Sequence, residues 1–198
     1  MTSKTRLNSD LIIRAAVRIA DEEGVEALTL ATLAQRLDIR SPSLYNHIAG
    51  LPELRRLLSL HGLEELRSEL LHAAVGRAGE GAIRAMAYAY LGFARAHPGL
   101  YELTLLSSKQ EDAEWAKVAN GIAELVVRAL ESYRLDPAAA IHTARALRSL
   151  LHGFASLERH GGFGLPFDLN ESFAEMVGLF LAGLQAQSAG PENGRKSD

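Results

Sequence analysis

From residue 8 to residue 187, apolar residues recur at three- and four-residue steps, and no alternating run of β-branched residues interrupts this spacing. Steps of three and four place apolar side chains on one face of an α-helix, whereas a half-buried strand needs a period of two. The pattern therefore predicts an all-α protein. Helix-ending signals separate the segments at Gly24, Gly79 to Gly81, His97 to Gly99, Asp136-Pro137 and residues 161–166.

Three short helices are predicted at the N-terminal end of the chain. The first begins after Asn8 or Ser9 and ends at Gly24, and the second follows Thr29. After a turn at residues 37–40, Ser41 and Pro42 predict the cap and first residue of a third helix that ends at Ile48. The side chains predicted to be buried in the first two helices are Ile12, Ala15, Ala16, Ile19, Leu30, Leu33 and Ala34.

Longer helices follow from Pro52, where the spacing of apolar residues continues without a flexible linker. They are predicted at about 52–76, 80–96, 99–107, 112–132, 138–160 and 169–187. We expect a helix-turn-helix head at 1–54, a helical bundle at 55–187 that binds a ligand and dimerises, and a polar, disordered tail at 188–198.

Composition excludes several classes of function. Cysteine is absent, which excludes disulfides and thiolate metal sites. No two histidines have the i, i+4 spacing of a helical metal site, and no motif of an enzyme nucleophile, phosphate loop or nicotinamide fold is present, so we expect no metal, no cofactor and no enzyme. The chain has no apolar run of membrane-spanning length and no secretory leader, so we expect a cytoplasmic protein.

The charge distribution is weakly consistent with nucleic-acid binding. The chain carries a net charge of -3, but residues 1–60 hold 8 Lys and Arg against 7 Asp and Glu, which leaves 13 against 17 for the rest. The N-terminal segment is therefore slightly positive, as phosphate contact favours. Its two short helices and tight turn match the helix-turn-helix layout, in which the second helix enters the major groove.

The residues from Leu28 to Ile39, followed by Ser41 to Ile48, closely resemble the TetR/AcrR regulator family, in which a Leu-Tyr-x-His run lies on the recognition helix. This resemblance covers about residues 6–60. A fainter one at Leu150 to Glu158 is similar to a TetR-type C-terminal domain marked by Trp-His-Gly, with Leu151 in place of the tryptophan. The resemblance implies a homodimer on a palindromic double-stranded DNA operator, and most simply a repressor that a small-molecule inducer releases; activation is the alternative.

Seven residues are candidates for DNA contact. Ser41 and Ser43 lie at a predicted helix N-terminus, where hydroxyl and backbone N–H groups meet phosphate or base edges, and Arg40 precedes them. The resemblance assigns phosphate contacts to Tyr45 and His47. The full set is Thr29, which also caps the second helix, with Arg40, Ser41, Ser43, Tyr45, Asn46 and His47.

Simpler interpretations of these residues remain open. Tyr45 packs against the first helix in one of them, and His47 is an ordinary surface histidine; Arg40 and Asn46 then face solvent. Leu44 is predicted to face the core of the head.

Three positions depart from the family pattern. Leu51 stands where the family commonly has a lysine, Ala31 where a basic residue is frequent, and Asp38 where a turn glycine is usual. Asp38 can adopt the left-handed conformation at modest cost. Together these departures predict fewer phosphate contacts and a milder salt dependence of DNA binding.

Two sets of apolar residues are assigned to the C-terminal half. A ligand pocket is predicted among the middle helices, lined by Tyr88, Phe93, Tyr101, Leu105, Trp115, Ile122, Leu147 and Phe154. A dimer interface is predicted on the last two helices, with Ile141, Ala144, Leu151, Phe173, Val177, Phe180, Leu181 and Leu184. In both cases an ordinary core is the alternative. The runner-up function is a small-molecule-binding or scaffolding helical protein whose head has lost DNA affinity.

Overall fold

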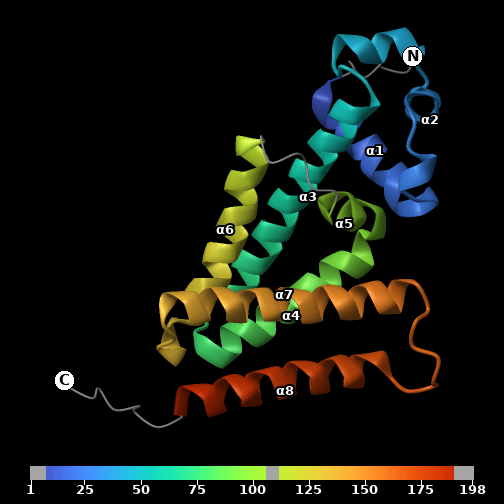
Figure 1. Cartoon of the computed structure of the whole chain (residues 1–198). Coiled ribbons are helices and arrows are strands. Elements are labelled where there is room, and N and C mark those ends of the chain that lie inside the picture. Colours follow the sequence, from blue (N-terminus) through green and yellow to red (C-terminus); the bar gives the residue numbers. More distant parts are fainter. Residues whose placement is uncertain (1–7, 106–111, 190–198) are drawn as a thin grey trace. The chain divides into compact units, whose positions relative to one another are not determined.

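The computed structural model describes residues 8–105 and 112–189, and every regular element in them is helical, which confirms the all-α prediction (Figure 1). None of the helices in these ranges is both long and apolar enough to cross a lipid bilayer. The elements are α1 (Ser9–Glu23), η1 (Val25–Ala27), α2 (Leu30–Arg36), η2 (Ser41–Asn46), α3 (Leu51–Ala74), α4 (Gly79–Ala96), α5 (Pro98–Leu105), α6 (Ala113–Ala129), η3 (Glu131–Tyr133), α7 (Pro137–Arg159) and α8 (Leu169–Ala189).

The chain forms two compact units. The first unit consists of Met1–Glu69 with Gly92–Gly121, and the second of Leu70–Leu91 with Ile122–Asp198. Helices α3, α4 and α6 each begin in one unit and end in the other. The first unit contains all of the predicted head and adds α5 to it. Helix α8 continues two residues past its predicted end, and the rest of the predicted tail, residues 190–198, lies outside the described residues.

Helix α1 begins and ends where its sequence predicts. The Asn8 side chain caps it by accepting a hydrogen bond of 2.8 Å from the Leu11 amide, and Gly24 ends it with a φ of 90°. A positive φ of this kind favours glycine, because a side chain would be strained there. The buried face consists of Ile12, Ala15, Ala16, Ile19 and Ala20.

The last turn of α1 lies directly against the first turn of α5. The Asp21 carboxylate accepts hydrogen bonds of 2.9 Å from the amides of Gly99 and Leu100, and its other oxygen is 2.9 Å from His97 Nδ1. Pro98 has no N–H, so Asp21 satisfies the first two amide donors of α5. The backbones approach so closely that a Cβ on Gly99 would lie 2.0 Å from the Ala20 carbonyl oxygen.

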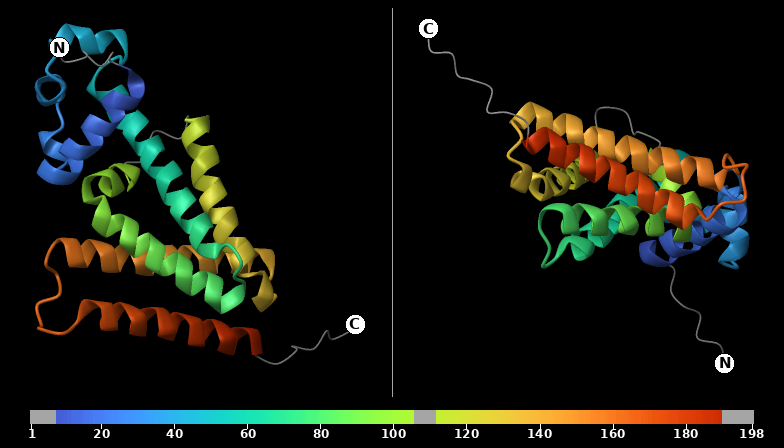
Figure 2. Two further views of the ribbon diagram at one scale, coloured as in Figure 1. Left: turned by 180° about the vertical axis from the view of Figure 1, so that it is seen from behind. Right: turned by 90° about the horizontal axis from the view of Figure 1, so that it is seen from below.

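In the second unit, α7 and α8 run side by side, as Figures 1 and 2 both show. Their shared core is aromatic. Phe173 is fully buried, and its ring lies 5.0 Å from that of Phe154 and 5.2 Å from that of Tyr88, both edge-on. Near the other end of α8, Gln185 donates a 2.9 Å hydrogen bond to Glu80 at the start of α4.

Because α1 and α5 are in close contact, one added methyl group at Gly99 should strongly reduce the stability of the protein. Gly99→Ala should destabilise the protein by about 1–3 kcal/mol or more, because the new Cβ forces two backbones apart. Gly92→Ala is the matched control, since nothing lies within 4 Å of its Cβ position in α4 and alanine favours a helix by about 0.5–1 kcal/mol. Urea unfolding of both variants tests this; equal stabilities would contradict the close approach.

Candidate nucleic-acid interface

Helix α2 is held by a capping box at Thr29. Thr29 Oγ1 accepts a 3.1 Å hydrogen bond from the Thr32 amide, and Thr32 Oγ1 accepts one of 3.0 Å from the Thr29 amide. This confirms the predicted cap. Leu33 and Ala34 are buried as predicted, whereas Leu30 is only half-buried. The phosphate contact assigned to the Thr29 hydroxyl stays a prediction.

The turn after α2 contains a left-handed residue. Asp38 has a φ of 52°, so aspartate adopts the conformation expected of the usual glycine. The turn is closed by the Asp38 amide, which donates to the Gln35 carbonyl at 3.1 Å, and by the Ile39 amide, which donates to the Ala34 carbonyl at 3.0 Å. The chain therefore leaves α2 in a single well-defined direction.

The third element differs from its prediction. It is a 3-10 helix, η2, over Ser41–Asn46, and its N-cap is Arg40 with no side-chain cap bond, so the predicted α-helix capped by Ser41 is wrong. The Ser43 amide donates to the Arg40 carbonyl, an i to i+3 bond of 2.9 Å, and Pro42 lacks the N–H that a longer ladder would use.

The three-residue period of η2 places one side chain in the core and its neighbours at the surface. Leu44 is fully buried, as predicted, and it anchors the element to the core of the head. Tyr45 is 60 % exposed, so the interpretation that it packs against α1 is not supported. Asn46 and His47 are exposed as well. One buried side chain thus holds η2 in place while the next three face outward.

The other candidate residues are less uniform. Arg40 is exposed, whereas Ser41, Ser43 and Thr29 are half-buried. The structure therefore brings six of the candidates together between Arg40 and His47, next to a turn whose backbone is well defined. Their contacts with DNA stay predictions.

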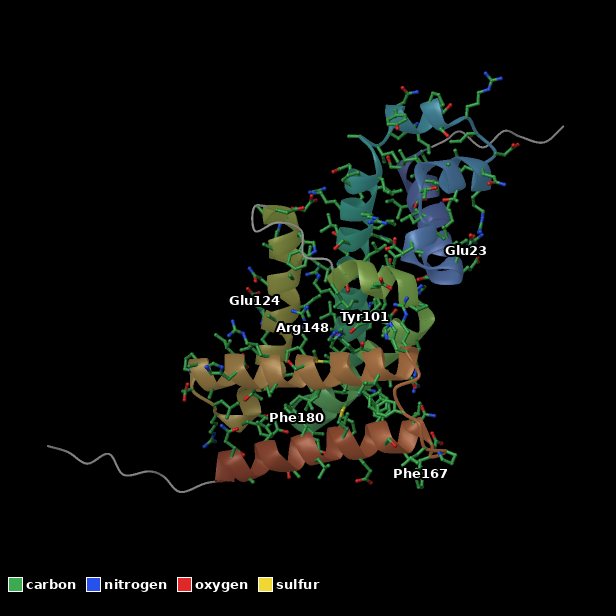
Figure 3. All side chains as sticks on the ribbon, turned by 45° about the vertical axis from the view of Figure 1, so that its right-hand side comes forward. Glu23, Tyr101, Glu124, Arg148, Phe167 and Phe180 are labelled. Carbon is green, nitrogen blue, oxygen red and sulfur yellow. The ribbon has the colours of Figure 1, made fainter. Side chains whose placement is uncertain are left out.

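Half of the basic side chains that the structure describes up to residue 60 are paired with carboxylates. Arg14 pairs with Asp10, and Arg36 pairs with Glu22 at 3.1 Å and with Glu23, which Figure 3 labels at the end of α1. Surface ion pairs of this kind contribute little to stability, but they reduce the charge available to phosphate. Among the described residues 8–60, Arg18, Arg40 and Arg55 have no ion-pair partner.

Arg56 forms a larger cluster with α6. Its Nε donates to Asp112 at 2.6 Å, and its Nη2 donates to Glu114 at 3.1 Å. Hydrogen bonding to Asp112 and then to Glu114 raises the pKa of Arg56 above its ordinary value. The pKa of Asp112 is lowered, first by the hydrogen bond from the Trp115 amide and then by Arg56. Asp112 thereby caps α6 and joins it to α3.

Arg55 is a basic residue on α3 that was not among the seven candidates for DNA contact. It lies one turn after Leu51 on α3, and its Nε atom is buried without a hydrogen-bond partner. The i, i+4 spacing from Leu51 is the signal that was available, because residues four apart share a helical face.

The predicted pocket residues divide between the two units. Phe93 and Tyr101 are buried in the first unit, where Trp115 is half-buried and Leu105 is 36 % exposed. Trp115 Nε1 donates a 3.0 Å hydrogen bond to the buried hydroxyl of Ser59. In the second unit, Leu147 and Phe154 are buried, Ile122 is half-buried and Tyr88 is 44 % exposed. That these eight residues line one cavity stays a prediction.

Five of the eight residues predicted for the dimer interface lie in the chain's own core. Side chains that are at most 5 % exposed in a single chain have little surface left to bury against a second one, so their assignment to the interface stays an unsupported prediction; they are Leu151, Phe173, Val177, Leu181 and Leu184. The ordinary-core alternative fits these five. Ile141 is 48 % exposed, and Ala144 and Phe180 are half-buried.

Helices α7 and α8 nevertheless present an exposed apolar surface. An open groove is lined by Leu150, Phe167, Met176, Leu179 and Phe180, with the carboxylates of Asp168, Glu171 and Glu175 beside them. Phe167, labelled just before the start of α8 in Figure 3, and Leu179 are each 73 % exposed. Across the described parts of the chain, no three histidine or acidic side chains come together as a metal site would require.

Comparison with known proteins identifies the family. A family model described as the tetracyclin repressor-like C-terminal domain matches residues 83–180. The chain is 39 % identical to the HTH-type transcriptional regulator YobS of Bacillus subtilis, over 93 % of this chain and 96 % of that protein. It is 34 % identical to the HTH-type transcriptional regulator Rv0681 of Mycobacterium tuberculosis, over 92 % of this chain and 84 % of that protein.

A solved structure agrees in fold. The transcriptional regulator SCO7222, a TetR from Streptomyces coelicolor, superposes with a TM-score of 0.69 at 22 % identity, covering 91 % of this chain and 98 % of that one. The chain belongs to the TetR family of helix-turn-helix transcriptional regulators.

Leu44 is buried and its neighbour Tyr45 is exposed, so substitutions at the two positions should differ in their effect on stability. Leu44→Ala should destabilise the protein by about 2–5 kcal/mol, because it removes a fully buried side chain from the head. Tyr45→Ala should change stability by no more than about 0.5 kcal/mol, since most of the ring faces solvent. Chemical denaturation measures both, and a large loss in the tyrosine variant would mean that its ring packs against the protein.

Proposed function

We propose that the protein is a transcriptional repressor that binds a palindromic operator as a homodimer and leaves it when a small molecule binds. The observation that carries this proposal is η2, in which a fully buried Leu44 anchors three successive exposed polar residues. Polar side chains held at a defined position on a short helix are what reading a DNA groove requires.

The exposed residues divide by chemistry into two roles. The Tyr45 hydroxyl and the His47 ring suit phosphate contacts, with the Thr29 hydroxyl beside the start of α2 as a further donor. Arg40 can donate two parallel hydrogen bonds to guanine, and the Asn46 amide can pair with adenine. Ser41 and Ser43, which are half-buried, lie between these residues and suit either partner.

The apolar groove on α7 and α8 supports a homodimer. Exposed leucine and phenylalanine side chains are costly in water, and a patch of this kind marks a protein interface. The groove includes Phe180, one of the residues predicted for the dimer interface, and the exposed Ile141 lies on the same pair of helices. We assign the second copy of the chain to this surface, because a palindromic operator requires a two-fold symmetric protein.

The apolar residues predicted for the pocket stay the candidates for contact with the proposed inducer. Its affinity and that of the operator must be linked reciprocally, since each ligand can change the other only through a shared coupling free energy, typically of about 1–3 kcal/mol. Calorimetry with the operator present and absent measures this coupling for any candidate compound.

Selection of bound sequences from a random DNA pool tests the proposal as a whole. We expect one palindromic site and a measurable decrease of affinity with salt. Retention on heparin gives a rapid first comparison. A salt slope near zero with no selected sequence would favour the runner-up, a helical ligand-binding or scaffolding protein without DNA affinity.

Removal of the proposed phosphate contacts should weaken binding to all DNA alike. Tyr45→Phe and His47→Ala each remove a group that contacts the backbone, which carries no base information, so operator and random DNA should lose affinity by the same factor. Gel-shift titrations on both DNAs measure this. A change in the selected operator in either variant would assign that residue to base reading instead.

Removal of a base contact should act on specificity. Arg40→Ala or Asn46→Ala should relax the preference at one defined base pair by about 1–3 kcal/mol, if the lost contact is bidentate. The measurement is the selected sequence of each variant beside that of the wild type. Unchanged selected sequences would place both side chains in solvent, as the simpler interpretation has it.

Disruption of the α7 and α8 groove should produce monomers. Leu179→Glu places a carboxylate in the apolar groove, and because Leu179 is 73 % exposed in the single chain, the fold should persist while the dimer dissociates. Val75→Glu is the control, since Val75 is 65 % exposed but lies outside this groove. Sedimentation measures the masses, and a dimeric Leu179→Glu variant would move the interface to another surface.

A further inference from the structure

A separate groove in the second unit has the dimensions of a small-molecule site. It is formed by the end of α3, the turn into α4, the first turn of α4, the end of α6 and η3, and its volume is about 370 Å³. Sites for small molecules have volumes of about 300–1,000 Å³. It shares no residue with the groove on α7 and α8 or with the predicted inducer pocket.

The walls of this groove are apolar and repeat at helical spacing. Leu71 lies in the last turn of α3, and Val75 directly follows the helix with its amide bonded to the Leu71 carbonyl at 3.1 Å. Leu125 and Ala129 lie four residues apart on α6 and share one helical face. Leu71 is 48 % exposed and Val75 is 65 % exposed. The chain thus leaves apolar surface uncovered where three helix ends meet.

The charged side chains of the groove indicate which charge a bound molecule should carry. Arg77 and Arg128 line it, and Glu131 is its one carboxylate, which gives a net charge of one positive unit. Arg77 Nη1 donates to the Ala73 carbonyl at 2.9 Å, and neither arginine forms an ion pair within the described ranges. Guanidinium groups bind carboxylates strongly and in fixed geometry, so an uncommitted pair favours an anion.

We propose that this groove binds a small amphipathic monocarboxylate, with its alkyl chain on the leucine, valine and alanine walls and its carboxylate at Arg77 and Arg128. The site goes beyond DNA-binding regulation and does not depend on it. Apolar walls alone would accept any alkyl chain, but the two guanidinium groups distinguish a carboxylate from a neutral or cationic head group.

Calorimetry on the full chain without DNA tests the proposal with three probes that share one alkyl chain: decanoate, decanol and decyltrimethylammonium. We expect decanoate to bind, decanol to bind at least about tenfold more weakly, and the cation not to bind. Arg77→Gln combined with Arg128→Gln should weaken decanoate by about tenfold and leave decanol unchanged. Arg145→Gln, which removes an exposed arginine on α7 outside the groove, should have no effect.

A second variant keeps the test decisive if the double substitution perturbs the fold. Val75→Glu adds a carboxylate at an exposed groove position and should abolish decanoate binding with circular dichroism unchanged. Decanoate binding that survives in both variants would place the ligand elsewhere in the chain and overturn the proposal. Equal binding of decanoate and decanol, or no binding of any probe, would also overturn it, the latter in favour of a protein-docking face. DNA affinity is not a readout here, so these outcomes are independent of the proposed repressor function.

Discussion

The contact between α1 and α5 is the constraint on which the first unit depends. Asp21 supplies three hydrogen-bond acceptor contacts to residues about eighty positions later in the chain, and Gly99 permits the backbones to touch. A negative charge is also favourable at a helix N-terminus, so the same carboxylate stabilises α5 as a helix. Gly62 makes a second close approach, since its Cβ position lies 2.7 Å from Thr104 and 3.0 Å from Leu100. Helices α1, α3 and α5 are therefore held together at points where only glycine fits.

Electrostatics act on this unit in two opposite ways. The Arg56 cluster joins α3 to the start of α6. Because the pKa of Asp112 is lowered in the folded protein, the Asp112 carboxylate stabilises the fold above the ordinary aspartate pKa. This stabilisation is lost as the pH falls through the lowered pKa. The same kind of pairing at Arg14 and Arg36 removes positive charge from the head. Salt sensitivity of DNA binding counts the phosphates that a protein neutralises, so a head with few uncommitted cations has a shallow slope. Hydroxyl and amide donors must then carry a larger share of the DNA contacts.

Interactions between residues close in sequence made some features of the structure predictable, whereas features that depend on distant residues were not predictable. The caps at Asn8 and Thr29, the end of α1 at Gly24 and the buried Leu44 follow from interactions within a few residues, and all are present. Ser41 and Pro42 also look like a helix start, but they cannot distinguish an α-helix from a 3-10 helix. The stripe on α8 correctly marks a buried face, yet periodicity does not reveal which surface covers it, and that surface is the chain's own core. The pairing of Asp21 with α5 has no local signature, because its partners are far apart in sequence.

The boundary between the two units changes how a signal must reach DNA. If the head ended near residue 54, a signal from the ligand would reach it only through the helix that starts near Pro52. In the structure, α5 is bonded to α1 within the same unit as the head, and three helices, α3, α4 and α6, continue from one unit into the other. Under the proposed function, a ligand that alters the second unit would act on the head through three continuous helices rather than one. Softening α3 alone leaves α4 and α6 intact, so loss of the proposed coupling requires changes in all three helices. Within the first unit, the segment from Arg95 to Gly99 joins α4 to α5, and Asp21 ties this segment to α1.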